Sequence, residues 1–383
     1  MPRMSVGHLI SLGRVRTMNK PPITIIEIDG RDARFQTGIG RYLDILSAGM
    51  PAHIKTLRII FYWSPDITEI HITQTDDEIS VRHPMGYPAQ ILFDAVIAFA
   101  GARIAKMPNL IIKSNCLGYE TLAYMLRARF YAKTVGVLHC LPHRARGANG
   151  RFPPHNPFFN MDHVILVCDH GVEYLRGVKC NRPHSIIYNG IDIPRITTKK
   201  PNDGVFRFIF ANGWAPHKGL QRIIPAIRTV ATKHKIEVIV IGGYDPKDKV
   251  FEEITDLPIT KVGLLENPDD ISKYYEIADC ALFASYSEAC SFAGIEAMSY
   301  NLPIISSDAA GLLEMFGKAG LFVNTGPDEK LDTAEYASHM LRVIECVALR
   351  TKMGILSYGR YKERYTSRKM IKDTVNLYER LVK

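Results

Sequence analysis

Short apolar runs rich in β-branched residues alternate with helix-like stretches in this chain, and the alternation occurs twice. In the first half the strand-like runs are 23–28, 57–62, 110–113, 134–139, 163–167 and 185–188. In the second half they are 206–211, 237–241, 260–263, 281–284, 303–306 and 321–323. Because helical stretches separate most of these runs, we expect parallel strands in βαβ units. The sequence therefore predicts an α/β protein with two doubly wound, Rossmann-like domains that face each other across a cleft.

A polar, Pro- and Lys-containing segment at 193–205, IPRITTKKPNDGV, separates the two sets of strands and predicts a linker. A length of 383 residues fits two domains of about 100 to 200 residues each. The predicted divisions are a basic N-terminal extension (1–22), a first domain (23–192), the linker (193–205), a second domain (206–357) and a C-terminal helical segment (358–383). Residues 67–82 suggest an antiparallel excursion. Two helices, about 333–349 and 369–382, are expected to close the chain.

Composition and charge limit where this chain can act and which partners it can bind. The chain has no apolar run near the roughly 20 residues that a membrane helix needs, and residues 1–22 lack the apolar core of a secretion signal. Seven scattered cysteines predict reduced thiols and a cytoplasmic protein. A net charge of +9 fits phosphate-bearing substrates, an anionic membrane surface or a merely basic surface. Nucleic acid is not expected, because the chain carries no binding signature for it.

Two carboxylates, Glu288 and Glu296, stand eight positions apart between the strand-like runs 281–284 and 303–306. A strand–loop–helix–strand order puts Glu288 on the loop and Glu296 two turns inside the helix. Both would then lie near the carboxyl ends of parallel strands, where open α/β sheets bind ligands. A buried helix with two incidental glutamates is the alternative for this spacing alone.

Further residues accompany this pair in a fixed order. They are Lys218-Gly219, Tyr274-Tyr275, Ala278-Asp279, Ser285, Ala297-Met298, Pro303-Ile304, Gly311 and Glu314. With them the chain resembles the glycosyltransferases of the GT-B fold, most closely the retaining group called family four. The resemblance is clear from about 206 to 323. It implies that the first domain lies on the acceptor side, that the second binds a nucleotide sugar, and that the last helix crosses back to the first domain.

The resemblance also implies roles for residues of the second domain. Glu296 would hold the ribose of the donor, because a carboxylate can accept hydrogen bonds from two vicinal hydroxyls. Lys218, at a helix start, would stabilise the leaving diphosphate, and Glu288 would lie near the transferred sugar. The helix start at Cys290, Ser291 and Phe292 would present backbone amides to the sugar and phosphate.

In the first domain, Gly38 and Gly40 follow the first strand, and by resemblance their loop faces the donor phosphates or the acceptor; a tight turn is the plainer interpretation. His139 ends a predicted strand and by resemblance lies near the transferred sugar; a core histidine is the alternative. The basic segment holding Arg144, Arg146 and Arg151 suits a phosphate-bearing acceptor, although it could be an ordinary surface loop.

The predicted activity is a retaining transfer of a hexose-type sugar from a UDP- or GDP-sugar to a hydroxyl acceptor, such as a lipid-linked or polysaccharide glycan precursor. No cofactor or metal is expected, since the chain has no metal-ligand motif. Peripheral contact with an anionic membrane is a further expectation. Relatives usually carry an arginine a few residues before the Lys218 position, and many have Phe-Gly at Cys290-Ser291. Both departures motivate an alternative, a catalytically inactive partner subunit. A sugar-nucleotide epimerase on the same fold is a further, less favoured alternative.

Overall fold

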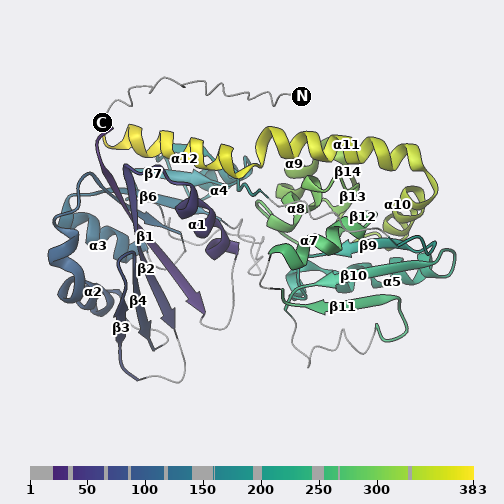
Figure 1. Ribbon diagram of the computed structural model, residues 1–383, viewed down its shortest axis with the longest axis horizontal. Helices are drawn as coiled ribbons and strands as arrows, with labels where there is room; N and C mark the ends of the chain where they lie inside the picture. Colours follow the sequence, from purple (N-terminus) through teal and green to yellow (C-terminus); the bar gives the residue numbers. More distant parts are fainter. Residues whose placement is uncertain are drawn as a thin grey trace, which may run out of the picture.

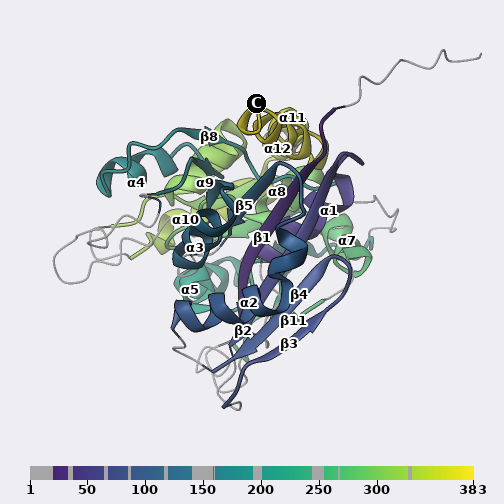
Figure 2. The ribbon, with the colours of Figure 1, turned by 90° about the vertical axis from the view of Figure 1, so that its left-hand side faces the viewer.

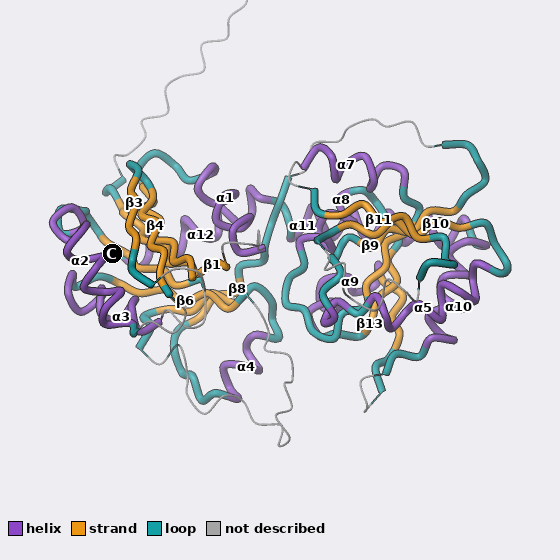
Figure 3. Tube along the Cα trace, turned by 90° about the horizontal axis from the view of Figure 1, so that it is seen from below, coloured by secondary structure: helices purple, strands orange, loops and turns teal. Residues whose placement is uncertain are grey.

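The structure is a computed structural model that describes residues 20–32, 38–63, 68–84, 88–115, 120–139, 158, 160–192, 201–243, 254–265, 268–326 and 330–383. The chain forms two lobes, each built on one mainly parallel sheet (Figure 1). Seen from below, helices cover the sheets of both lobes (Figure 3). No helix within the described ranges is long and apolar enough to cross a membrane.

The first sheet has the strand order β3-β4-β2-β1-β5-β6-β7-β8. Neighbouring strands pair in parallel except β3 and β4, which form the antiparallel excursion that the sequence suggests. The strands are β1 (Ile23–Asp32), β2 (Ile54–Trp63), β3 (His71–Gln74), β4 (Glu78–His83), β5 (Leu110–Ser114), β6 (Lys133–Leu138), β7 (His163–Leu166) and β8 (His184–Ile186).

Helices cover both faces of this sheet, so its central strand β1 is apolar on both sides. Ile25 packs with α1 (Gly38–Gly49) and α12 (Ser367–Leu381). Ile26 and Ile28 face the other way, toward α2 (Ala89–Ile104), α3 (Glu120–Phe130) and α4 (Gly171–Gly177). Figure 2 views the molecule from this lobe.

The second sheet is wholly parallel, with the order β11-β10-β9-β12-β13-β14. Its strands are β9 (Phe206–Phe210), β10 (Ile236–Ile241), β11 (Ile259–Gly263), β12 (Cys280–Phe283), β13 (Ile304–Ser307) and β14 (Gly320–Val323). Its helices are α5 (Leu220–Ala231), α7 (Pro268–Ile277), α8 (Phe292–Ser299), α9 (Ala310–Phe316), α10 (Thr333–Glu345) and α11 (Val347–Arg364). The strand order reverses between β9 and β12, and such a switch point opens a crevice at the carboxyl ends of the strands.

Three helices close the chain, where the sequence predicts two. The missed helix, α11, buries only Met353, Gly354 and Ser357, and its apolar Val347 and Ile355 are exposed. Such a pattern gives little periodic signal. In Figure 1, α11 and α12 run along the top of the molecule from the second lobe to the first.

The chain returns to the first lobe beside the segment 187–192. The N–H of Ile191 donates to the carbonyl of Tyr365 at 3.0 Å. A Cβ atom on Gly190 would lie 2.2 Å from the carbonyl oxygen of Thr366, so only glycine lets these two backbones meet. Helix α12 then packs on α1 of the first lobe. Helices α11 and α12 therefore connect the second lobe to the first.

Candidate active site

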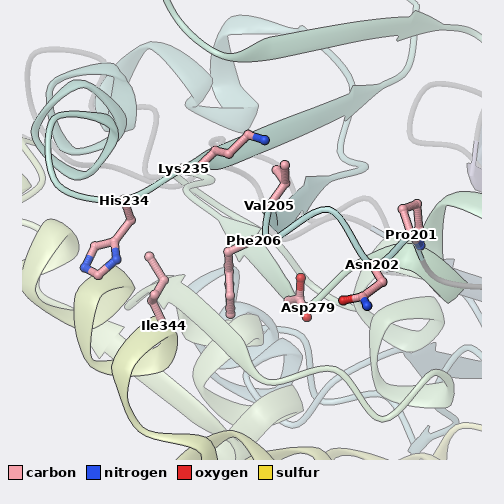
Figure 4. A pocket seen from close by; sticks show the side chains of 9 residues that line it. Pro201, Asn202, Val205, Phe206, His234, Lys235, Asp279 and Ile344 are labelled. Atoms are coloured by element: carbon pink, nitrogen blue, oxygen red, sulfur yellow. The ribbon is translucent and has the colours of Figure 1, made fainter.

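The predicted strand–loop–helix–strand order is present, as β12, a loop carrying Glu288, helix α8 carrying Glu296, and β13. Both glutamates lie on the carboxyl side of the second sheet, next to the switch point between β9 and β12. A shallow pocket at the opposite edge is lined by Phe206, His234 and Asp279, which precede or begin strands (Figure 4). That pocket is therefore separate from the glutamate pair.

Lys218 and Glu288 form an ion pair across the switch point. The Nζ of Lys218 lies 2.5 Å from Oε1 of Glu288, with 23% and 11% of the two side chains exposed. Lys218 ends a short 3-10 turn, and Gly219 follows with φ +78°. A Cβ atom on Gly219 would lie 2.1 Å from the carbonyl oxygen of Ala284. Glycine is thus required both for the left-handed backbone and for the close approach that brings Lys218 to the glutamate loop.

The loop of Glu288 is held from several sides. The hydroxyl of Ser285 donates to Glu288 Oε1 at 3.2 Å, and Ser307 at the end of β13 donates to the carbonyl of Ser285 at 2.7 Å. On the other side, a Cβ atom on Gly311 would lie 2.3 Å from the carbonyl oxygen of Glu288. Helix α9 therefore packs directly on the loop backbone, which fixes the carboxylate in the crevice.

Glu296 is buried in α8, with 5% of its side chain exposed, and both of its oxygens have partners. Arg41, on α1 of the first lobe, donates from Nη1 to Oε1. The hydroxyl of Tyr275 donates to Oε2 at 2.7 Å. Burial, and then the charge of Glu296, raise the pKa of Tyr275 well above its usual value, so this hydroxyl stays protonated and remains a donor. Glu296 is thus a desolvated carboxylate that accepts hydrogen bonds from both lobes.

Two helix starts meet beside these carboxylates. The N–H groups of Phe292 and Ala293, at the start of α8, have no partner among the described residues. Helix α1 starts at Gly38, where an added Cβ atom would lie 3.6 Å from the ring of Phe292. Neither helix has an acidic residue in its first turn. Helix N-termini carry partial positive charge, so the space between the lobes suits an anion.

Residues Cys290 and Ser291 play structural parts at this helix start. Ser291 is the N-cap, and its hydroxyl accepts from the N–H of Gly294 at 3.3 Å. Cys290 is buried in the core, burial raises the pKa of its thiol, and its carbonyl accepts from the side chain of Asn189 at 2.9 Å. The side chain of Cys290 therefore points into the protein, and the groups left to a ligand are the amides that follow.

His139 directly follows β6 in the first lobe. Its ring packs edge-on against Tyr42 of α1, with centroids 4.6 Å apart. Burial, and then the charge of Lys113, lower the pKa of His139 to about 3, so the ring is neutral at neutral pH. Its Nε2 atom is buried and has no partner among the described residues. Within those residues no hydrogen bond joins His139 to Glu288.

Beneath His139 the first lobe contains a buried ion pair. Lys113 is fully buried and donates to both oxygens of Glu27, at 3.1 and 3.3 Å. Its ammonium also lies 4.6 Å from the ring centroid of Tyr42. Burial alone would lower the pKa of Lys113, but the charge of Glu27 raises it above its usual value, so the lysine stays charged. This pair connects α1 and α12 to the sheet under the crevice.

The residues at the site differ in part from those that the sequence predicts. Arg144, Arg146 and Arg151 lie outside the described residues. Arg41 and Tyr275 contact Glu296 but have no predicted role. Tyr275 belongs to the Tyr-Tyr pair of the family-like motif, and Arg41 follows Gly38 and Gly40, so sequence signals existed for both.

No cluster of three or more His, Cys, Asp or Glu side chains able to hold a metal occurs in the described ranges.

The segment that carries these second-lobe contacts is similar to known proteins. Residues 194–355, which include Lys218, Glu288 and Glu296, match the family model for Glycosyl transferases group 1, so the predicted resemblance is confirmed over this segment. The O-antigen biosynthesis glycosyltransferase WclY of Escherichia coli is 25% identical over 209 residues, 51% of this chain and 56% of that protein. The O-antigen chain mannosyltransferase RfbU of Salmonella typhimurium is 28% identical over 149 residues, 38% and 41% of the two chains. The chain thus spans about half the length of the curated relatives it matches.

Solved structures match over nearly the whole chain. Sucrose-phosphate synthase from Thermosynechococcus elongatus has a TM-score of 0.72 at 19% identity, covering 94% of this chain and 99% of that one. HepE of Anabaena, in complex with UDP, has a TM-score of 0.70 at 15% identity, covering 92% and 99%. These likenesses confirm the predicted GT-B fold of two facing Rossmann-like domains.

Proposed function

We propose that this chain, with its glycosyl transferases group 1 domain in a GT-B fold, is a retaining glycosyltransferase. It moves a hexose-type sugar from a UDP- or GDP-sugar to a hydroxyl acceptor. The observation that carries the proposal is the convergence of Lys218, Glu288 and Glu296 at one sheet edge, beside the unpaired amides of α8. That the similar HepE structure contains UDP favours a nucleotide donor of this kind.

The donor would bind with its ribose at Glu296 and its diphosphate at Lys218 and the helix start. A buried carboxylate that already accepts from Tyr275 can accept two further hydrogen bonds from vicinal hydroxyls. A lysine and free helix amides neutralise a diphosphate by charge and by hydrogen bonding. The proposed donor site therefore needs no metal ion, because this chain supplies the positive charge.

In the transfer step, the bond between the anomeric carbon and the diphosphate oxygen breaks, and the oxygen keeps the electron pair. The acceptor hydroxyl attacks from the same face, and its proton passes to the departing phosphate oxygen. Lys218 stabilises the negative charge that develops on the phosphate. Glu288 orients the sugar hydroxyls and stabilises positive charge at the anomeric carbon, and the neutral His139 offers a hydrogen bond to the sugar.

The acceptor is proposed to be a lipid-linked or polysaccharide glycan, delivered at an anionic membrane surface. The names of two relatives concern O-antigen biosynthesis, which favours a glycan. Helix α2 exposes Ile91 and Phe99, which are about two turns apart, by 45% and 48%. Arg103 and Lys106 lie near its C-terminal end. Exposed apolar side chains near basic ones favour reversible attachment to anionic lipids.

Incubation with labelled UDP- and GDP-sugars, with glycan-lipid extracts as acceptor, tests the activity. We expect transfer by the wild type and its loss in Lys218→Ala and Glu296→Ala. Full activity of both variants would overturn the assigned roles. A wild type that binds the donor and never transfers or hydrolyses it would instead identify an inactive partner subunit.

A further inference from the structure

We infer that Arg41 is an exchangeable partner of Glu296, which nucleoside-diphosphate binding moves from this carboxylate to the phosphates. The inference rests on the proposed function and adds to it a residue of the first lobe that senses the donor. In the sequence, Arg41 and Glu296 are 255 positions apart, and their contact joins α1 to α8 across the lobes.

Of the two partners of Glu296, Tyr275 is fixed and Arg41 can leave. Tyr275 is 1% exposed, and its ring stacks on Tyr300 with centroids 5.4 Å apart and an interplanar angle of 10°. A side chain packed in this way is fixed. Arg41 is 31% exposed and comes from the opposite lobe, so its guanidinium approaches Glu296 from the crevice. Arg41 therefore covers the side of the carboxylate that ribose hydroxyls must reach.

The guanidinium of Arg41 lies close to the proposed phosphate site. Arg41 lies one turn into α1, whose start at Gly38 faces the ring of Phe292. Its guanidinium carbon is already 5.3 Å from the centroid of that ring. The ring belongs to Phe292, whose N–H is one of the unpaired amides at the start of α8, so a rotation of the long side chain carries the charge toward the anion site. Guanidinium is well suited to bidentate phosphate binding.

The diphosphate needs more positive charge than Lys218 alone supplies. Lys218, the nearby second-lobe cation, is paired with Glu288, so it is shared between a carboxylate and the incoming diphosphate. A displaced Arg41 supplies a second full positive charge. A ligand with a ribose and no phosphate must break the Arg41–Glu296 pair without giving the guanidinium a new partner. The exchange thus makes the site selective for nucleoside diphosphates over nucleosides.

Calorimetric titration of UDP and uridine, with GDP and guanosine in parallel, separates these effects. In Arg41→Ala we expect the diphosphate to bind at least about tenfold more weakly, as for a lost charge-assisted hydrogen bond. The matching nucleoside should bind more tightly than to the wild type, because Glu296 no longer has a competing partner. The affinity of Arg41→Lys for the diphosphate should lie between those of the wild type and Arg41→Ala, since lysine keeps the charge and loses the planar guanidinium group.

The matched control is Asp44→Ala, which removes a different ion pair of α1, the one with Arg58 at 2.7 Å, and should leave both affinities unchanged. If Arg41→Ala weakened nucleoside and diphosphate equally, or left diphosphate affinity unchanged, the exchange would be refuted while the proposed function stood. If the wild type bound neither UDP nor GDP, the proposed function would fail as well.

Discussion

The ammonium of Lys218 lies 2.5 Å from Oε1 of Glu288, although the two residues are 70 positions apart in the chain. One follows β9 and the other follows β12, and these strands are neighbours at the point where the strand order reverses. The pair therefore marks the crevice of the second lobe, and its members provide one positive and one negative group at the proposed reacting centre.

Removing the cation from this pair should chiefly affect the chemical step. In Lys218→Ala we expect the turnover rate to fall by about 10²- to 10³-fold, the size of loss typical for a group that stabilises developing negative charge. Initial rates with a saturating donor measure this effect. His217→Ala, on the preceding residue of the same turn, is the control. Equal losses in both variants would indicate damage to the turn rather than a missing charge.

Replacing Gly219 with alanine should lower the free energy of unfolding more than replacing Gly213, which has the same φ angle but no neighbouring atoms in the way. Gly213 and Gly219 both have φ +78°, so alanine carries a left-handed strain of about 1 to 2 kcal/mol at either position. An added Cβ atom at Gly219 also meets the carbonyl of Ala284, while at Gly213 nothing lies within 4 Å. Urea unfolding should give a clearly larger loss for Gly219→Ala, and similar losses would contradict this account.

Acidification should destabilise the protein partly through His139. Its pKa is about 3 in the folded state, whereas an unfolded histidine titrates near about 6.5. Between these values the unfolded chain binds the extra proton, so the free energy of unfolding falls as pH falls, by up to about 1.4 kcal/mol per pH unit. In His139→Asn, urea unfolding at pH 7, 6 and 5 should show a shallower decline. Parallel curves would show that His139 does not contribute.

Membrane attachment through α2 should depend on its apolar side chains and on salt. Sedimentation with phosphatidylglycerol vesicles at low salt should exceed that with phosphatidylcholine, and should decrease when Ile91 and Phe99 are both changed to Asp. Changing Arg144, Arg146 and Arg151 together to Ala should also weaken binding. Ile355→Asp, at an apolar position of α11 that is 65% exposed, is the control. Equal sedimentation with both lipids would refute the attachment.

The sequence predicts the local features of the site well and its long-range contacts poorly. The sequence predicts Glu288 on a loop and Glu296 in a helix correctly, because the strand, the loop and the helix follow each other directly in the chain. The contact of Arg41 with Glu296 depends on how the lobes are placed, and no local pattern encodes that. For the same reason, the sequence does not reveal that the carbonyl of Cys290 accepts from the side chain of Asn189, a residue of the first lobe.

We propose that Glu296 holds the ribose of a nucleoside-diphosphate donor, and a calorimetric comparison of two nucleotides measures this contact. The wild type and Glu296→Gln are titrated with UDP or GDP, whichever binds, and with the 2′,3′-dideoxy form of the same nucleotide. We predict that the wild type prefers the hydroxylated ligand by at least about tenfold, the value of one hydrogen bond to a charged group, and that Glu296→Gln loses most of this preference. An equal preference in both proteins would contradict the claim.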